Sequence, residues 1–125
     1  MESPRIVVHE NGRRWVDHIR ARMRGLAVQV RHSTSARDCL ELVRGRRRSL
    51  IVLEWGTQPL AGMELLDQVH GLDPEAAVLV VARPVPVPVE LLTRELGAAG
   101  FIHEPVAPTE LADLVEHAFR TRQTD

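Results

Sequence analysis

Residues 50–55 read Leu-Ile-Val-Leu-Glu-Trp, and this stretch decides the fold. Four consecutive apolar residues predict a strand buried on both faces, because a strand with one solvated face alternates apolar and polar side chains. Glu54 follows directly, so the strand delivers a carboxylate to the edge of its sheet. Two other apolar runs also end in polar groups: residues 5–8 before His9 and Glu10, and residues 100–102 before His103 and Glu104. If the strands are parallel, these groups meet at one edge and form a candidate site.

Segments with helical periodicity alternate with apolar runs along the rest of the chain. Strands are expected at residues 5–9, 26–31, 50–54, 77–82 and 101–102. Helices are expected after the N-cap Asn11 up to Gly25, after one of residues 33–35, from Met63 to Asp73, at residues 91–96, and from Ala107 with Thr109 or a neighbour as N-cap. Three prolines exclude a helix or central strand at residues 83–88. This alternation predicts one flavodoxin-like α/β domain over residues 1–125, with a core of about residues 4–121, three layers and parallel strand order 2-1-3-4-5.

A single cysteine and the lack of a long apolar segment bear on the compartment. Cys39 has no partner for an internal disulfide, which suits a reducing environment. The longest apolar run covers residues 76–82, far short of the roughly 20 residues of a membrane helix. The N-terminus lacks the apolar core of a signal peptide. We therefore expect a cytoplasmic protein with no membrane partner.

The net charge of −1 conceals an uneven distribution of charge. All 16 basic residues are Arg, and residues 1–48 hold 12 of them but only 5 of the 17 acidic residues. Seven arginines at or near expected helix-to-strand turns should gather at the end of the sheet opposite Glu54: Arg20, Arg22, Arg24, Arg44, Arg46, Arg47 and Arg48. Such a basic end suits nucleic-acid phosphates or an acidic protein. The chain has few aromatic residues for base stacking, with two Phe, two Trp and no Tyr. We therefore rank nucleic acid below a protein as the expected partner.

The order and spacing of these features resemble the receiver domain of two-component response regulators over residues 4–118. In that family the first strand ends in an acidic pair that holds magnesium, and the third ends in the aspartate that is phosphorylated. The fourth strand ends in Thr or Ser followed by Ala, and the fifth presents an aromatic residue and then Lys-Pro. The matching positions here carry His9-Glu10, Glu54, Val81-Ala82, Phe101 and Glu104-Pro105. The resemblance implies a CheY-like fold, a role in bacterial signalling and a cis peptide bond before Pro105.

The departures from the family pattern form a degenerate phosphorylation pocket of His9, Glu10, Glu54, Val81 and Glu104. His9 removes one magnesium carboxylate, Val81 removes a hydroxyl, and Glu104 reverses the charge of the lysine. Glu54 is one methylene longer than Asp, which displaces a nucleophile by about 1 Å. Because phosphoryl transfer depends on neutralising charge, we expect a pseudo-receiver that is not an enzyme and has no cofactor. The alternatives are an atypical phosphoacceptor that uses Glu54, and a Glu54 side chain that imitates the phosphorylated state.

The resemblance also implies a binding surface for a protein partner on the fourth helix, fifth strand and fifth helix. Its candidate residues are Leu92, Arg94, Phe101, His103, Val106 and Asp113. A homodimer is compatible with opposite charges at opposite ends of the molecule. The remaining alternative is a transition-metal site at the polar rim of His9, Glu10, Glu54, His103 and Glu104. Their spacing matches no closed zinc-site signature, so we assign no metal.

Overall fold

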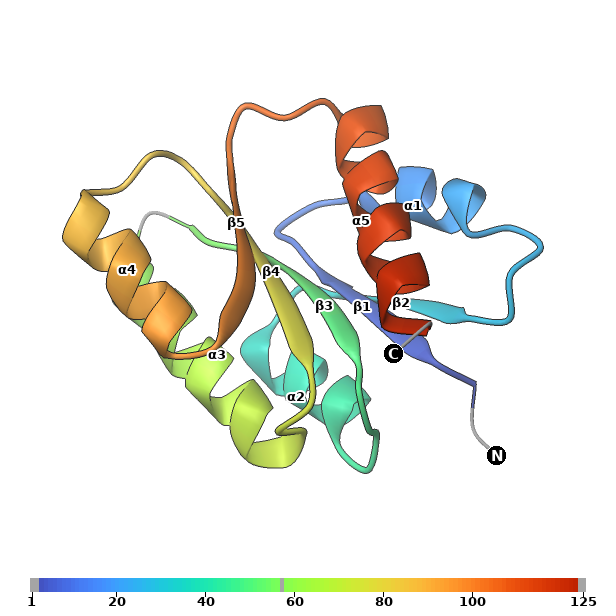
Figure 1. Cartoon of the computed structure of the whole chain (residues 1–125), viewed down its shortest axis with the longest axis horizontal. Coiled ribbons are helices and arrows are strands. Elements are labelled where there is room, and N and C mark those ends of the chain that lie inside the picture. The colour runs from blue at the N-terminus through green and yellow to red at the C-terminus, as the bar shows by residue number, and fades with distance from the viewer. Residues whose placement is uncertain (1–2, 57, 124–125) are drawn as a thin grey trace.

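The computed structural model describes residues 3–56 and 58–123, and its centre is one parallel sheet in the order β2-β1-β3-β4-β5 (Figure 1). The strands are β1 Arg5–His9, β2 Gln29–Ser33, β3 Leu50–Glu54, β4 Ala77–Ala82 and β5 Ala98–His103. The helices are α1 Val16–Arg22, α2 Ala36–Val43, α3 Pro59–Leu72, α4 Val87–Glu95 and α5 Pro108–Gln123. All neighbouring strands run parallel. The predicted flavodoxin-like fold and strand order are confirmed.

Helices cover both faces of the sheet and bury two cores. α1 and α5 pack on one face, and α2, α3 and α4 pack on the other (Figure 1). Because side chains alternate along a strand, β3 supplies Leu50 and Val52 to the first core and Ile51 and Leu53 to the second. Each of these four side chains is at most 2 % exposed. Burial on both faces therefore explains the unbroken apolar run of residues 50–53.

Three helices have a proline in their first turn, and all three begin at residues other than those predicted from the sequence. α3 begins at Pro59 rather than near Met63, and α4 begins at Val87, inside the segment predicted to be non-helical. Proline is tolerated there because the first amides of a helix have no intrahelical acceptor, so the missing N–H is not needed. α5 begins at Pro108, which places Thr109 inside the first turn and excludes it as the N-cap.

Two strands have different bounds from those predicted. β2 begins at Gln29 rather than Leu26, because residues 23–28 form tight turns in which the Leu26 amide donates to Met23 O at 3.0 Å. β5 begins at Ala98, three residues before Phe101, and pairs with β4 through a register shift at Val78. Among the residues that the structure describes, no helix has both the length and the apolar character to cross a membrane.

Candidate functional site

The carboxyl ends of β1, β3 and β5 bring Glu10, Glu54 and Glu104 to one edge of the sheet, as predicted from the sequence pattern. Glu54 is the last residue of β3, and Glu10 and Glu104 directly follow β1 and β5. The peptide bond between Glu104 and Pro105 is cis, as the resemblance implies. The side chains of Glu54 and Glu104 are each only 16 % exposed, and the side chain of Glu10 is fully buried. Carboxylates held this far from water need hydrogen-bond donors or a cation beside them.

The carboxylate of Glu10 caps the first helix. It accepts hydrogen bonds from the backbone amides of Arg14 at 2.8 Å, Trp15 at 3.1 Å and Val16 at 2.9 Å. These amides precede or begin α1 and have no acceptor within the helix, and a negative charge is favourable at this end. The predicted N-cap, Asn11, is wrong, because α1 begins five residues later at Val16. Both carboxylate oxygens of Glu10 therefore bind the backbone at the start of α1 and fix the loop between β1 and α1.

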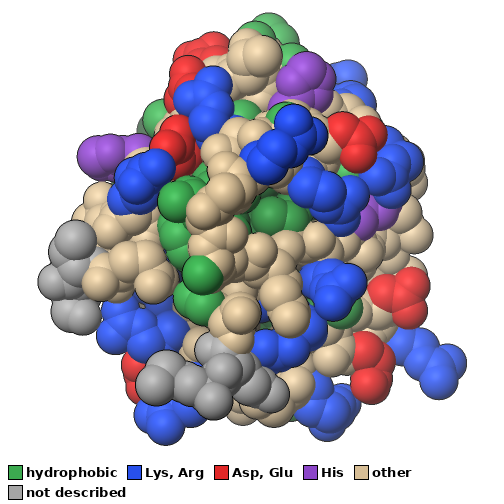
Figure 2. Space-filling model, turned by 90° about the vertical axis from the view of Figure 1, so that its right-hand side faces the viewer, with side chains coloured by type: hydrophobic (Ala, Val, Ile, Leu, Met, Phe, Trp, Pro, Cys, Tyr) green, Lys and Arg blue, Asp and Glu red, His purple; other side chains and the backbone are tan. Residues whose placement is uncertain are grey.

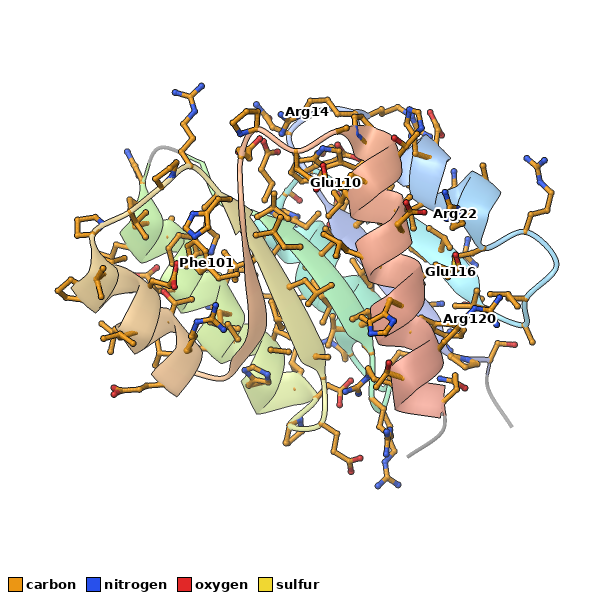
Figure 3. All side chains as sticks on the ribbon, turned by 45° about the horizontal axis from the view of Figure 1, so that its top comes forward. Arg14, Arg22, Phe101, Glu110, Glu116 and Arg120 are labelled. Atoms are coloured by element: carbon orange, nitrogen blue, oxygen red, sulfur yellow. The ribbon has the colours of Figure 1, made fainter. Side chains whose placement is uncertain are left out.

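Arg14 lies between the other two carboxylates and binds both. Its Nη2 donates to Oε2 of Glu54, and its Nη1 lies 3.1 Å from Oε1 of Glu104. The other oxygen of Glu54 accepts the Asn11 amide at 2.7 Å. Figure 3 shows Arg14 beside the loop that leads into α5. One guanidinium therefore joins the β1–α1 loop, the end of β3 and the residue that follows β5.

Arg14 is the residue of the candidate site that was not predicted from the sequence. Its guanidinium carbon lies 4.4 Å from the ring centroid of Trp15, so stacking on the indole helps to orient the side chain. The available signal was the charge at the sheet edge. Glu54 and Glu104 were expected at one edge without a lysine, and a cation between neighbouring carboxylates is favourable. Arg13 and Arg14 closely follow Glu10, which was expected at the same edge.

Val81 contributes no polar group to this edge. It lies in the sheet opposite Glu54 in the β3–β4 register, and its side chain is completely buried in the core beneath α1 and α5. Its carbonyl accepts the Trp55 amide at 2.9 Å. No hydroxyl at this position is available to an anion bound beside Glu54.

The two histidines at this edge, His9 and His103, have partners other than Glu10, Glu54 and Glu104. His9 Nδ1 is 2.8 Å from Ser33 Oγ, and His103 Nε2 is 3.0 Å from Glu90 on α4. Burial lowers the pKa of His9 below its usual value, although the charge of Glu54 opposes the shift. Within the described part of the chain, no three His, Cys, Asp or Glu side chains are grouped to hold a metal ion. The five polar residues of the predicted rim thus do not converge on one point.

The predicted partner surface is only partly continuous. Leu92 on α4 is 46 % exposed and Arg94 pairs with Glu90 at 3.7 Å, but Phe101 is buried, with its ring 5.8 Å edge-on from Trp55. Including Phe101 in an exposed surface is therefore wrong, because this side of β5 faces the core beneath α3. Val106 and His103 lie near the carboxyl edge, with Val106 partly buried. Asp113 pairs with Arg22 of α1, which places it on the opposite side of α5 from α4.

Two exposed apolar side chains on α4, Val87 and Leu91, were not singled out from the sequence, whereas Leu92 was. Val87 is 70 % exposed and Leu91 is 54 % exposed, and together with Leu92 they form the apolar patch of α4. Val87 and Leu91 are four residues apart, so they lie on the same side of the helix. Because residues 83–88 were predicted to be non-helical, Val87 was not recognised as part of the same helix as Leu91.

Arg20 and Arg22 of the predicted basic end lie in the last turn of α1, and the other five arginines lie in the turns that follow α1 and α2. Most of the seven have acceptors in the described part of the chain. Arg46 reaches Gln29 at the start of β2, and Arg48 donates its amide to Asp73 at the turn before β4. Their ion-pair partners include Glu41 for Arg44, Glu75 for Arg47, Asp17 for Arg20, and Asp113 and Glu116 for Arg22. Figure 3 shows Arg22 on α1 directed toward Glu116 on α5. Acidic residues thus offset much of the basic charge that the sequence indicates.

Comparisons with known proteins agree with this architecture. No family model matches the chain, and no curated protein matches it in sequence. A CheY-like response regulator receiver domain protein from Methanospirillum hungatei superposes with a TM-score of 0.77 at 18% identity, covering 98% of both chains. A response regulator from Thermotoga maritima gives 0.76 at 14% identity, over 94% of this chain and 98% of that chain. The pilus assembly protein CpaE from Caulobacter crescentus gives 0.67 at 17% identity, over 91% of this chain and 98% of that chain. The chain therefore has the fold of response-regulator receiver domains.

Proposed function

We propose that this chain is a phosphorylation-independent pseudo-receiver that acts as a protein–protein interaction module in bacterial signalling or regulation. The observation that carries the proposal is the position of Arg14, whose guanidinium contacts both Glu54 and Glu104. The cation at this edge comes from the chain itself and is present whether or not a signal arrives. The pocket is thus occupied by a permanent internal ion pair.

Phosphoryl transfer to a carboxylate has two requirements that this arrangement does not favour. The attacking oxygen must be free, and cations must neutralise the charge of the transferring group. Both oxygens of Glu54 already accept hydrogen bonds, one from Asn11 and one from Arg14. The guanidinium is shared with Glu104, so its charge is already offset by two carboxylates. These contacts support a pocket without phosphotransfer chemistry.

The same contacts support a surface that stays in one shape. Arg14 ties together three segments that are distant in the sequence, at β1–α1, β3 and the loop after β5. Ordinary switching would require one of them to move and break a contact in a partly buried environment. We infer that the partner meets a constitutive surface, with the apolar patch of α4 and Arg94 as its centre and Phe101 excluded.

The test of the missing phosphotransfer is an intact-mass measurement after incubation with acetyl phosphate and magnesium. We expect the mass to stay unchanged, while an ordinary receiver domain treated in parallel gains a phosphoryl group. A phosphoryl adduct on this chain that disappears in Glu54→Gln would overturn the proposal. It would instead support the alternative in which Glu54 is an atypical phosphoacceptor.

The test of the interaction surface compares two exposed apolar sites in pull-downs from native lysate. The variant Leu92→Glu changes the α4 surface, and Leu60→Glu changes a 68 % exposed residue on α3 as the matched control. We expect Leu92→Glu to lose the proteins that the wild type captures, and Leu60→Glu to retain them. Equal capture by both variants would discard the α4 surface.

A further inference from the structure

We propose that the groove between α1 and β2 is a docking site for an extended protein segment that carries acidic and apolar side chains. The groove has a volume of about 430 Å³. It lies at the β2 edge of the sheet, whereas α4 precedes β5 at the other edge. Its lining combines four apolar side chains with two arginines: Met23, Leu26, Val28, Val30, Arg20 and Arg24. The inference concerns a different surface from the proposed pseudo-receiver function and does not rest on it.

The floor of the groove is apolar and only partly covered. Leu26, Val28 and Val30 pack against the core beneath α1 and α5, yet each remains partly accessible to solvent. An apolar side chain from a partner would remove this remaining surface from water, which is favourable in proportion to the area covered. The groove therefore has a place for an aliphatic side chain.

One wall of the groove is the open edge of the sheet. β2 is the edge strand of the sheet. Its Gln29 amide donates to Pro4 O at 2.9 Å, and its Ser33 carbonyl accepts the Glu10 amide at 3.1 Å, so both groups face β1. Because main-chain groups alternate along a strand, those of Val30 and His32 point toward the open side. The Val30 carbonyl already accepts Arg20 Nη2 at 3.0 Å, which shows that this side accepts donors. An extended segment could pair with this edge as an added strand.

The charges around the groove select an acidic occupant. Arg20 and Arg24 are the charged residues that line it, and no acidic side chain lines it. Arg24 has no ion pair among the described residues, and the pair of Arg20 with Asp17 is long at 3.8 Å. Figure 2 views the molecule from this side and shows hydrophobic side chains near its centre, with many basic and fewer acidic side chains around them. Acidic side chains that flank an apolar one would match this pattern.

Nucleic acid fits the groove less well than a protein segment. Its phosphates would also meet the arginines, but no residue that lines the groove is aromatic, so bases have no stacking platform. The apolar floor and the open strand edge offer nothing specific to a phosphate backbone. The observations thus favour a protein segment, and RNA becomes an outcome of the test.

The experiment uses the full chain labelled with nitrogen-15 and two synthetic peptides of equal length. One alternates Asp or Glu with Leu or Val, and the other carries Lys at the acidic positions. Amide chemical shifts locate the bound peptide, and fluorescence anisotropy measures the dissociation constant. We expect the acidic peptide alone to shift amides in residues 23–32. Arg24→Glu should weaken its binding by about tenfold, whereas Arg37→Glu, an exposed arginine on α2, should leave it within about twofold.

A further variant changes the apolar floor without changing the charge. Val28→Asn places a neutral amide on the groove floor and should abolish binding while the amide spectrum keeps its native dispersion. Four results would overturn the proposal: no shifts at about millimolar acidic peptide, equal binding of the basic peptide, shifts confined to other surfaces, or tighter binding of a single-stranded RNA oligonucleotide that also loses affinity in Arg24→Glu.

Discussion

Replacing Arg14 by alanine tests the ion pair at the centre of the proposed pseudo-receiver. Arg14→Ala removes the only side chain that forms ion pairs with both Glu54 and Glu104 among the described residues. Exposed ion pairs contribute about 0.2–1 kcal/mol each. The arginine is 49 % exposed, but each carboxylate is only 16 % exposed and loses a partner in a poorly solvated place. We therefore expect a loss of about 1–2 kcal/mol in the free energy of unfolding, or about 3–10 °C in Tm for a chain of this size.

The neighbouring arginine provides a matched control. Arg13 is 55 % exposed and, within the described part of the chain, pairs with Asp17, which is 63 % exposed, so Arg13→Ala should leave the stability almost unchanged. Arg14→Lys keeps the charge but not the two-armed donor, and its stability should fall between wild type and Arg14→Ala. The assay is thermal and urea unfolding followed by circular dichroism at low salt and neutral pH.

Added magnesium sharpens this comparison. Without Arg14, two carboxylates remain close together with no cation, and oxygen ligands are those that magnesium prefers. Magnesium should raise the Tm of Arg14→Ala and leave the wild type unchanged, because a ligand that binds only the folded state stabilises it. The reasoning is refuted if Arg14→Ala and Arg13→Ala have the same stability and neither responds to magnesium.

Three further predictions concern packing, pH and thiol reactivity. Gly62→Ala should destabilise by about 1–3 kcal/mol, because its new methyl group would clash with the indole ring of Trp55. Gly71→Ala in the same helix meets nothing within 4 Å and should be neutral or stabilising by up to about 1 kcal/mol. Equal effects of the two variants in urea unfolding would contradict the packing. The pKa of His9 is lowered in the folded state, so the unfolded chain takes up this proton first and stability should fall as pH drops from about 6.5 toward the lower folded pKa. His9→Gln should lessen that fall in Tm, and an unchanged pH profile would count against it. Burial raises the pKa of Cys39 to about 11, so iodoacetamide should label the thiol at pH 8 only in denaturant, and rapid labelling of the native chain would disprove its burial.

The strand positions were the part of the fold most accessible from the sequence. The bounds of β1, β3 and β4 are confirmed, because each is a short apolar run that ends in a polar or turn-forming residue. The starts of α3 and α4 were wrong, because composition shows where prolines lie but not that they occupy a first turn. The predicted start of β2 was wrong, because residues 26–28 are also apolar but form local turn hydrogen bonds and do not pair with β1.

The candidate site, too, could be predicted from the sequence only in part. The sequence pattern correctly brought Glu54 and Glu104 to one edge, since parallel strands share the direction of their carboxyl ends. It did not show that Arg14 lies between them, because the path of the loop after β1 depends on Glu10 capping α1. It also did not show that Phe101 faces Trp55, because a strand residue's side depends on the register of the sheet.

By itself, the sequence determined the number and order of the elements, the parallel sheet and the residue types at the ends of its strands. Local periodicity and residue identity carry that information, and folding cannot supply a lysine to a chain that has none. Only the tertiary structure decided which cation meets the carboxylates, which apolar side chains stay exposed on α4, and how far acidic partners offset the arginines. These outcomes depend on distances between residues far apart in the chain, such as the 3.1 Å from Arg14 to Glu104, and packing of the whole fold sets those distances.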